Sequence, residues 1–151
     1  MENGVLAGYP VVDVGVELLD GKEHPVDSSE MAFKVAARGA LNEAMAKAKP
    51  TLLEPIMNLN VFIEEQYLGD VLGDLSGRRG RVLGQEQLGG GIIEIRAQVP
   101  QAELLRYAID LRSITSGTGG FELEFSHYNP ISGKIADDVI AAAKAAEEVE
   151  A

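Results

Sequence analysis

Between residues 57 and 128 the spacing of hydrophobic side chains changes repeatedly from strand-like to helix-like, and this order strongly constrains the fold. Alternation at every second residue, typical of half-buried strands, occurs in four stretches: 57–63, 82–88, 92–99 and 121–128. Spacing of three to four residues, typical of amphipathic helices, occurs in two: 67–75 and 102–113. The order strand-helix-strand-strand-helix-strand is that of a split βαβ pair. The sequence therefore predicts a ferredoxin-like sandwich of the α+β class.

Glycines mark the turns of this predicted domain. Gly80 closes the first strand-helix unit, and Gly89, Gly90 and Gly91 join the second and third strands. Consecutive glycines can cradle a phosphate, but these connect two strands instead of leading into a helix. We therefore interpret them as a hairpin turn.

A second, smaller unit is predicted upstream. Hydrophobic residues alternate with polar ones or glycine at four positions: Val12, Val14, Val16 and Leu18. This pattern predicts a half-buried strand, which the dipeptide Asp20-Gly21 ends as a turn. A single strand cannot give a helix a sheet to pack on, so we expect this unit to be only part of a domain.

A helix follows an exposed tip at His24-Pro25. Asp27 stands three residues before Glu30, which is the spacing of a capping box and predicts a helix from about Ser28. The following apolar stripe, rich in alanine, runs from Phe33 to Ala48 and predicts close packing on a sheet.

The chain divides into three expected segments: 1–54, 55–130 and 131–151. Pro50 and Pro55 bracket a short connector, because proline restricts the preceding residue and ends the alanine-rich helix. From Ser132 a narrow apolar stripe predicts a final helix.

Charge limits how the chain can bind nucleic acid. The formal net charge is −11, which repels phosphate over the molecule as a whole, and basic residues cluster only at Arg78, Arg79 and Arg81. The predicted open face of the sheet is polar and lacks aromatic residues: Asn58, Asn60, Glu94, Arg96, Gln98, Glu122, Glu124 and Ser126. This composition excludes RNA recognition by base stacking on that face.

Other classes of protein are also disfavoured by composition. The sequence has no cysteine and two histidines that lie far apart, so it offers no disulfide and no transition-metal constellation. No apolar run approaches the roughly 20 residues that span a bilayer. We expect a cytoplasmic, non-membrane protein without a metal site.

Both histidines have ordinary structural interpretations. His24, Asp27, Ser28 and Ser29 include the residue types of a nucleophilic triad, but they are crowded at a helix start, where we expect the hydroxyls and the carboxylate to act as caps. By composition alone, His24 is interpreted as an exposed loop histidine. His127 lies in line with the apolar residues of the last predicted strand, so we expect it to be partly buried and hydrogen-bonded on that face.

Five stretches of the sequence carry a resemblance to a known family. They are LAGYPVVDVGVELLDGKEHPVDSSEMAFKVAA, KAKPTLLEPIM, GDVLGDLSGRRGRVLGQE, VPQAELLRYAIDLRS and FELEFSHY. Together they closely resemble the fourth and fifth domains of elongation factor G, the ribosomal translocase. The resemblance implies a partial fourth domain of βαβ type, similar to the second domain of ribosomal protein S5, followed by the ferredoxin-like fifth domain and a C-terminal helix.

The resemblance also implies sites and partners. It places His24, Pro25, Asp27, Ser28 and Ser29 at the tip that enters the decoding centre beside the tRNA–mRNA duplex. It assigns contacts with ribosomal RNA and protein to a second group: Arg78, Arg79, Arg112, Ser113 and Thr115. The implied partners are both ribosomal subunits, with no DNA and no membrane.

The implied role is mechanical and not catalytic. No GxxxxGK[ST] phosphate loop occurs in the sequence, so GTP and Mg²⁺ are expected in the intact parent factor and no cofactor in this chain. We expect the chain to be the C-terminal part of such a factor, which promotes tRNA–mRNA translocation.

Two alternatives remain open. Gly77, Ser116 and Thr118 stand where the family commonly carries basic or amide residues, which favours a paralogue acting in ribosome recycling or rescue. The second alternative is a stand-alone ferredoxin-like regulatory domain that binds a small ligand, for which the only support is the glycine turn at 89–91.

Overall fold

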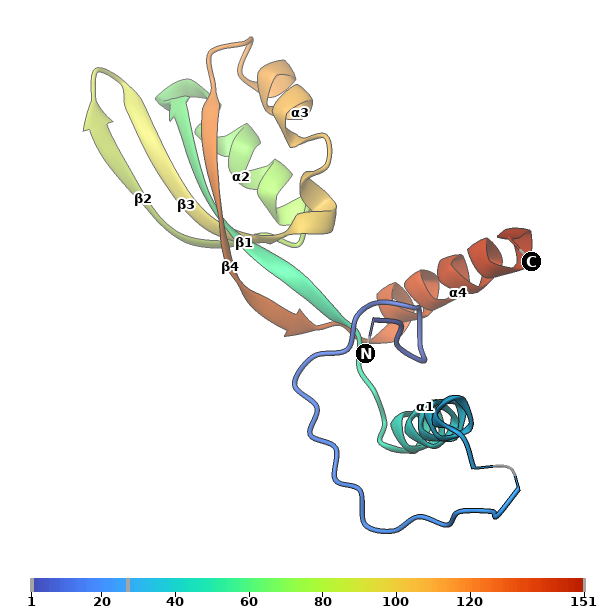
Figure 1. Cartoon of the computed structure of the whole chain (residues 1–151). Helices are drawn as coiled ribbons and strands as arrows, with labels where there is room; N and C mark the ends of the chain where they lie inside the picture. Colours follow the sequence, from blue (N-terminus) through green and yellow to red (C-terminus); the bar gives the residue numbers. More distant parts are fainter. Residues whose placement is uncertain (1, 27, 151) are drawn as a thin grey trace. The chain divides into compact units, whose positions relative to one another are not determined.

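The computed structural model describes residues 2–26 and 28–150 (Figure 1). By their internal contacts the residues form two compact units. One is continuous, Leu53–Pro130, and the other combines the segments 1–52 and 131–151. We describe each unit by itself.

The continuous unit is a four-stranded antiparallel sheet with two helices on one face (Figure 1). The sheet order is β2-β3-β1-β4. Along the chain the elements are β1 (Leu53–Glu64), a 3-10 turn (Glu65–Tyr67), α2 (Leu68–Gly77), β2 (Arg81–Gly89), β3 (Ile92–Pro100), a second 3-10 turn (Gln101–Leu104), α3 (Tyr107–Ile114) and β4 (Gly120–Pro130). This topology confirms the predicted ferredoxin-like sandwich.

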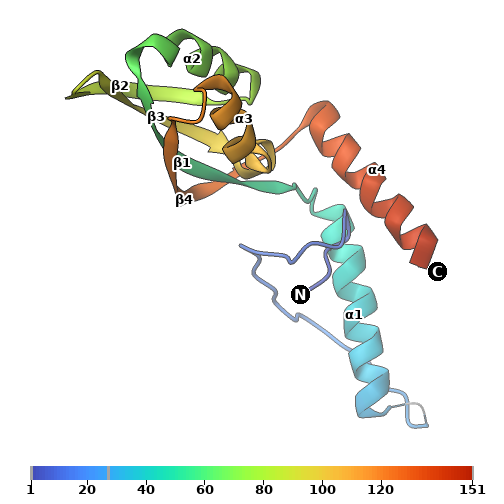
Figure 2. The same ribbon diagram turned by 90° about the horizontal axis from the view of Figure 1, so that it is seen from above.

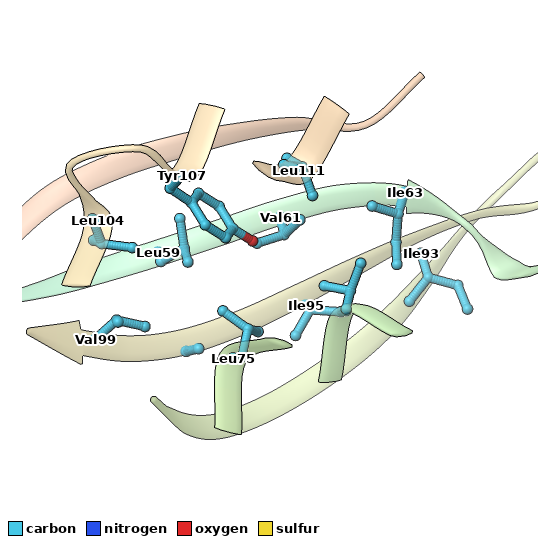
Figure 3. Packing of buried hydrophobic residues seen from close by; sticks show 12 residues of the cluster. Leu59, Val61, Ile63, Leu75, Ile93, Ile95, Val99, Leu104, Tyr107 and Leu111 are labelled. Atoms are coloured by element: carbon cyan, nitrogen blue, oxygen red, sulfur yellow. The ribbon is translucent and has the colours of Figure 1, made fainter. Parts of the chain in front are cut away.

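The core of this unit lies between the sheet and its two helices (Figure 3). Alternate residues of the central strands point into it, because side chains along a strand alternate between faces. The fully or almost fully buried members are Leu59, Val61, Ile63, Val71, Leu75, Ile93, Ile95, Ala97, Val99, Leu104, Tyr107 and Leu111. The Tyr107 ring meets Phe121 edge-on at a centroid distance of 5.1 Å. The period-two pattern of the sequence thus identified the core-facing side of β1 and β3.

The predicted helix over 102–113 is divided in the structure. A 3-10 turn ends at Leu104, and α3 begins only at Tyr107. Leu104, at the end of the 3-10 turn, and Tyr107, at the start of α3, are both buried in the core.

The glycine hairpin is confirmed. Gly89, Gly90 and Gly91 have φ of 92°, 64° and 79° between β2 and β3. These values lie in the left-handed region, which glycine adopts without a steric penalty.

In the other unit, the helix α1 (Glu30–Lys47) begins later than predicted and has a different cap. Ser29 is the N-cap, since its Oγ accepts a hydrogen bond from the backbone N of Ala32 at 3.1 Å. The predicted cap, Asp27, lies outside the described residues. Ser29 thus accepts a hydrogen bond from a free backbone N–H of the first helical turn, which is the role that the sequence predicted for Asp27.

The predicted strand over 12–18 is not formed. This segment has no regular secondary structure, and Val12, Val14, Val16 and Leu18 are 49–88% exposed. A strand needs a neighbour to accept its backbone hydrogen bonds, and the described part of this unit contains no other strand. The prediction that α1 packs on a sheet is also wrong, because the described part of this unit contains no sheet. Phe33, on the apolar stripe of α1, is accordingly 51% exposed.

The last element, α4 (Gly133–Glu150), is the helix predicted for the C-terminal segment. Both α1 and α4 are uninterrupted (Figure 2). No helix in the described ranges has the length and hydropathy required to cross a bilayer.

Candidate functional site

The tip before α1, which carries His24 and Pro25, is held by hydrogen bonds of Ser28. Ser28 Oγ accepts from the backbone N of His24 at 2.8 Å and donates to the backbone O of the same residue. The backbone N of Val26 donates to His24 Nδ1 at 3.4 Å. His24, Pro25, Ser28 and Ser29 are all exposed. Ser28 therefore closes a small loop that presents His24 and Pro25 at the surface, while Ser29 caps the helix.

Arg78, predicted to contact ribosomal RNA, is used inside the domain. Its side chain is only 15% exposed. Nε donates to Asp74 at 2.8 Å, and Nη2 donates to Asp110 at 2.6 Å. Nη1 donates to the backbone O of Glu103 at 2.7 Å, which ties the end of α2 to the segment that carries α3. These bonds leave the guanidinium little capacity for an external phosphate.

The surroundings of Arg78 stabilise its charge. The hydrogen bond to Asp74 and, to a smaller extent, the one to Asp110 raise the pKa of Arg78, against the opposing effect of burial. The guanidinium also lies 5.1 Å from the centre of the Tyr107 ring, a cation–π distance. Burial raises the pKa of Tyr107 as well, and its hydroxyl is the one buried side-chain polar atom without a hydrogen bond in the described chain.

Arg79 is also engaged by carboxylates. Its two terminal nitrogens donate to the two oxygens of Glu54 at 2.8 and 3.1 Å, and Nε donates to Glu103 at 3.1 Å. The hydrogen bond to Glu54 is the main cause of a raised pKa for Arg79. This planar, two-point pairing is typical of arginine with a carboxylate. The side chain is 33% exposed, so its outer edge remains at the surface.

The loop after α3 is organised by Thr115, which is completely buried. Its Oγ1 donates to the backbone O of Leu111 at 2.7 Å and accepts from the backbone N of Gly119 at 2.9 Å. Thr115 therefore has no side-chain surface to offer to a partner, unlike its neighbours Arg112 and Ser113, which are exposed.

The outer face of α3 carries residues that sequence reasoning did not assign to a site. Leu105 is 85% exposed and Ile109 is 58% exposed. Ile109, Arg112 and Ser113 lie three and four residues apart within α3, so they share one helical face, and the exposed Leu105 lies in the turn before α3. This helical spacing is the sequence signal that could have identified the face. We call Leu105, Ile109, Arg112 and Ser113 the α3 outer face.

His127 lies on the opposite face of the sheet from the one predicted. Phe125 pairs with Met57, but His127 pairs with Ile56, so Ser126 is an extra residue in β4. Such a bulge changes the face to which the following residues point. His127 is half-buried and its Nδ1 lies 2.8 Å from Ser126 Oγ, as expected for a satisfied histidine. On the polar open face of the sheet, Gln98 Nε2 donates hydrogen bonds to Asn58 Oδ1 and to Ser126 Oγ.

Two further features bear on ligands and metals. The glycine hairpin borders a cavity of about 110 Å³, below the roughly 300 Å³ of small-molecule sites, so it gives little support to the regulatory-domain alternative. Across residues 2–26 and 28–150, no group of three or more His, Cys, Asp or Glu side chains is placed to hold a metal ion.

Comparisons with known proteins cover both units. Residues 51–139 match the family model described as elongation factor G C-terminus, and residues 1–49 match the model of elongation factor G, domain IV. Among solved structures, a crystal structure of the protein ttk003000868 from Thermus thermophilus aligns with a TM-score of 0.80 and 43% sequence identity. The alignment covers 95% of this chain and 22% of that chain.

Proposed function

The chain belongs to the elongation factor G family, and from this premise we propose that it is the non-catalytic arm through which a translational GTPase contacts the ribosome. In this role the chain promotes movement of the tRNA–mRNA pair. The observation that carries the proposal is the match of both family models along the chain, with His24 exposed at the tip of the part that matches domain IV.

The tip is the proposed contact with the decoding centre. His24 and Pro25 present their side chains to the surface on a loop closed by Ser28, and α1 begins directly behind it. A short, internally hydrogen-bonded loop on a helix can be inserted as a preformed unit, which reduces the entropy lost on binding. The proposed partner is the tRNA–mRNA duplex on the small subunit.

The α3 outer face is the proposed contact with the large subunit. Leu105 and Ile109 supply exposed apolar surface, and Arg112 and Ser113 supply a cation and a hydroxyl. Such a mixture suits a surface made of RNA and protein, since arginine binds phosphate and apolar side chains pack on protein. Arg78 and Arg79 support this face from within the domain through their ion pairs.

The proposed mechanism is mechanical. The sequence contains no phosphate loop, so GTP and Mg²⁺ would bind in another part of a longer factor, of which this chain would form the C-terminal arm. Hydrolysis there would drive the arm, and His24 would hold the tRNA in its advanced position. The proposed site of action is the cytoplasm, with both ribosomal subunits as partners.

The test uses the intact factor carrying His24→Ala. We expect single-round translocation to slow by about tenfold or more, since a direct contact made only in the moved state acts on the rate. Ribosome co-sedimentation and GTP hydrolysis should stay unchanged. Glu17→Ala is the matched control, because Glu17 is exposed in the segment leading to the tip. Unchanged translocation by the His24 variant would contradict the proposal.

A second candidate is a paralogue that acts in ribosome recycling or rescue. The loop 115–120 carries no basic side chain, and Thr118 Oγ1 is used within the loop, where it donates to the backbone O of Thr115 at 2.8 Å. A less basic loop weakens attraction to ribosomal RNA. Complementation of a translocase deletion separates the candidates: full complementation by the intact factor would exclude the paralogue.

A further inference from the structure

The open face of the sheet in the unit Leu53–Pro130 contains a cavity of about 440 Å³. This volume falls within the roughly 300–1,000 Å³ of small-molecule sites. The lining residues come from all of the strands and from the turn before β2: Glu54, Ile56, Arg79, Arg81, Gln98, Pro100, His127 and Asn129. The cavity shares no lining residue with the tip or with the α3 outer face.

Strand register brings these residues together. Ile56 pairs with Pro100 on one side and with His127 on the other, so these three form one row across the sheet. Arg81 pairs with Gln98 in the neighbouring row, and Glu54 pairs with Asn129. The bulge at Ser126 is essential, because without the extra residue the side chain at position 127 would point to the core side.

The floor of the cavity is apolar and its walls are polar. Ile56 is 7% exposed and Pro100 is buried, so they form a hydrophobic base. Gln98, His127 and Asn129 add hydrogen-bonding groups at the sides. Six of the eight lining residues are charged or polar, so the cavity suits a hydrophilic ligand better than an apolar one.

The charges of the cavity favour an anionic group at Arg81. Arg79 is paired with Glu54 through two hydrogen bonds, so these two charges offset each other. Arg81 is exposed, and within the described residues no carboxylate forms an ion pair with it. A free guanidinium in a chain of net charge −11 is a local site of opposite sign. Its planar donors match the oxygens of a phosphate.

We propose that this cavity binds a sugar phosphate, either free or as part of a nucleotide. The phosphate lies on Arg81, and the sugar lies over Ile56 with its hydroxyls hydrogen-bonded to Glu54 and Asn129. Glu54 retains acceptor capacity while it binds Arg79, since a carboxylate has about four lone-pair sites.

The test is an NMR titration of the full chain with ribose 5-phosphate, AMP, ribose and inorganic phosphate at constant ionic strength. We expect saturable shifts for Arg81, Gln98 and His127 with ribose 5-phosphate, at a Kd of about 1 mM or below. Ribose and inorganic phosphate should bind at least about tenfold more weakly, because each offers only half of the contacts. Tighter binding of AMP would assign the site to a nucleotide, and weaker binding of AMP would assign it to the free sugar phosphate.

Arg81→Gln should weaken binding of ribose 5-phosphate at least about tenfold, since it removes the charged donor. Arg96→Gln is the matched control, because Arg96 is exposed on the same sheet, is paired with Glu86 and does not line the cavity. It should leave the Kd within about twofold. Absence of saturable shifts, equal loss in both variants, or inorganic phosphate binding as tightly as ribose 5-phosphate would each overturn the proposal.

Discussion

Replacing Arg78 with alanine should destabilise the domain Leu53–Pro130 far more than the loss of an ordinary surface arginine. The side chain is 15% exposed and bonds Asp74, Asp110 and the backbone of Glu103. The bonds to Asp74 and to the carbonyl are each worth about 1 kcal/mol. The bond to Asp110, which is 39% exposed, and the contact with Tyr107 each add about 0.5 kcal/mol. We expect the free energy of unfolding to fall by about 3 kcal/mol, in keeping with a broken partly buried ion pair.

Urea denaturation of the full chain, followed by tyrosine fluorescence and circular dichroism, measures this loss. Arg78→Lys keeps the charge but not the planar fork, so it should recover only part of it. The control is Arg96→Ala, whose pair with Glu86 is exposed on both sides, 51% and 59%, and should cost less than about 0.5 kcal/mol. If Arg78→Ala lay within about 0.5 kcal/mol of the parent chain, the structural role of Arg78 would be refuted.

Two further predictions concern buried hydroxyls. Tyr107→Phe should raise the free energy of unfolding by about 1 kcal/mol, because the hydroxyl is buried without a hydrogen bond. Burial also raises the pKa of Tyr107, so the parent chain should lose stability as the pH rises above about 10, where an unfolded tyrosine ionises. The phenylalanine variant should lose less stability over the same range. Equal pH profiles of the two chains in urea titrations would contradict this. Thr115→Val should cost about 1–3 kcal/mol, because the backbone N of Gly119 loses its acceptor. Ser113→Ala, an exposed change in the same helix, should cost less than about 0.5 kcal/mol, and an equal loss in both would contradict the role of Thr115.

The ferredoxin-like topology could be predicted from the sequence because its signals are local. Alternation in β1 and β3 identified the strands and their buried side, and glycines identified the hairpin. The strand over 12–18 shows the limit of the same argument. Its pattern is as regular as that of β1, but a pattern describes one strand and not the neighbour it needs.

Apart from the helical pair of Arg78 with Asp74, the contacts of Arg78 and Arg79 could not be predicted, because they depend on residues far along the chain. Arg78 meets Asp110 at a sequence separation of 32 residues, and Arg79 meets Glu54 at a separation of 25. In the sequence the two arginines form a basic cluster, but in the structure four carboxylates surround them. Only the packing of the helices on the sheet brings these distant carboxylates close to the two arginines.

The single extra residue in β4 also affects how related chains should be compared. Ser126 shifts the register, so positions before it and after it follow opposite rules of inside and outside. A relative that lacks this insertion would place an aligned residue 127 on the side of the sheet that faces the helices, even with an identical side chain there. Substitution patterns in β4 are therefore meaningful only when they are read separately on the two sides of the bulge.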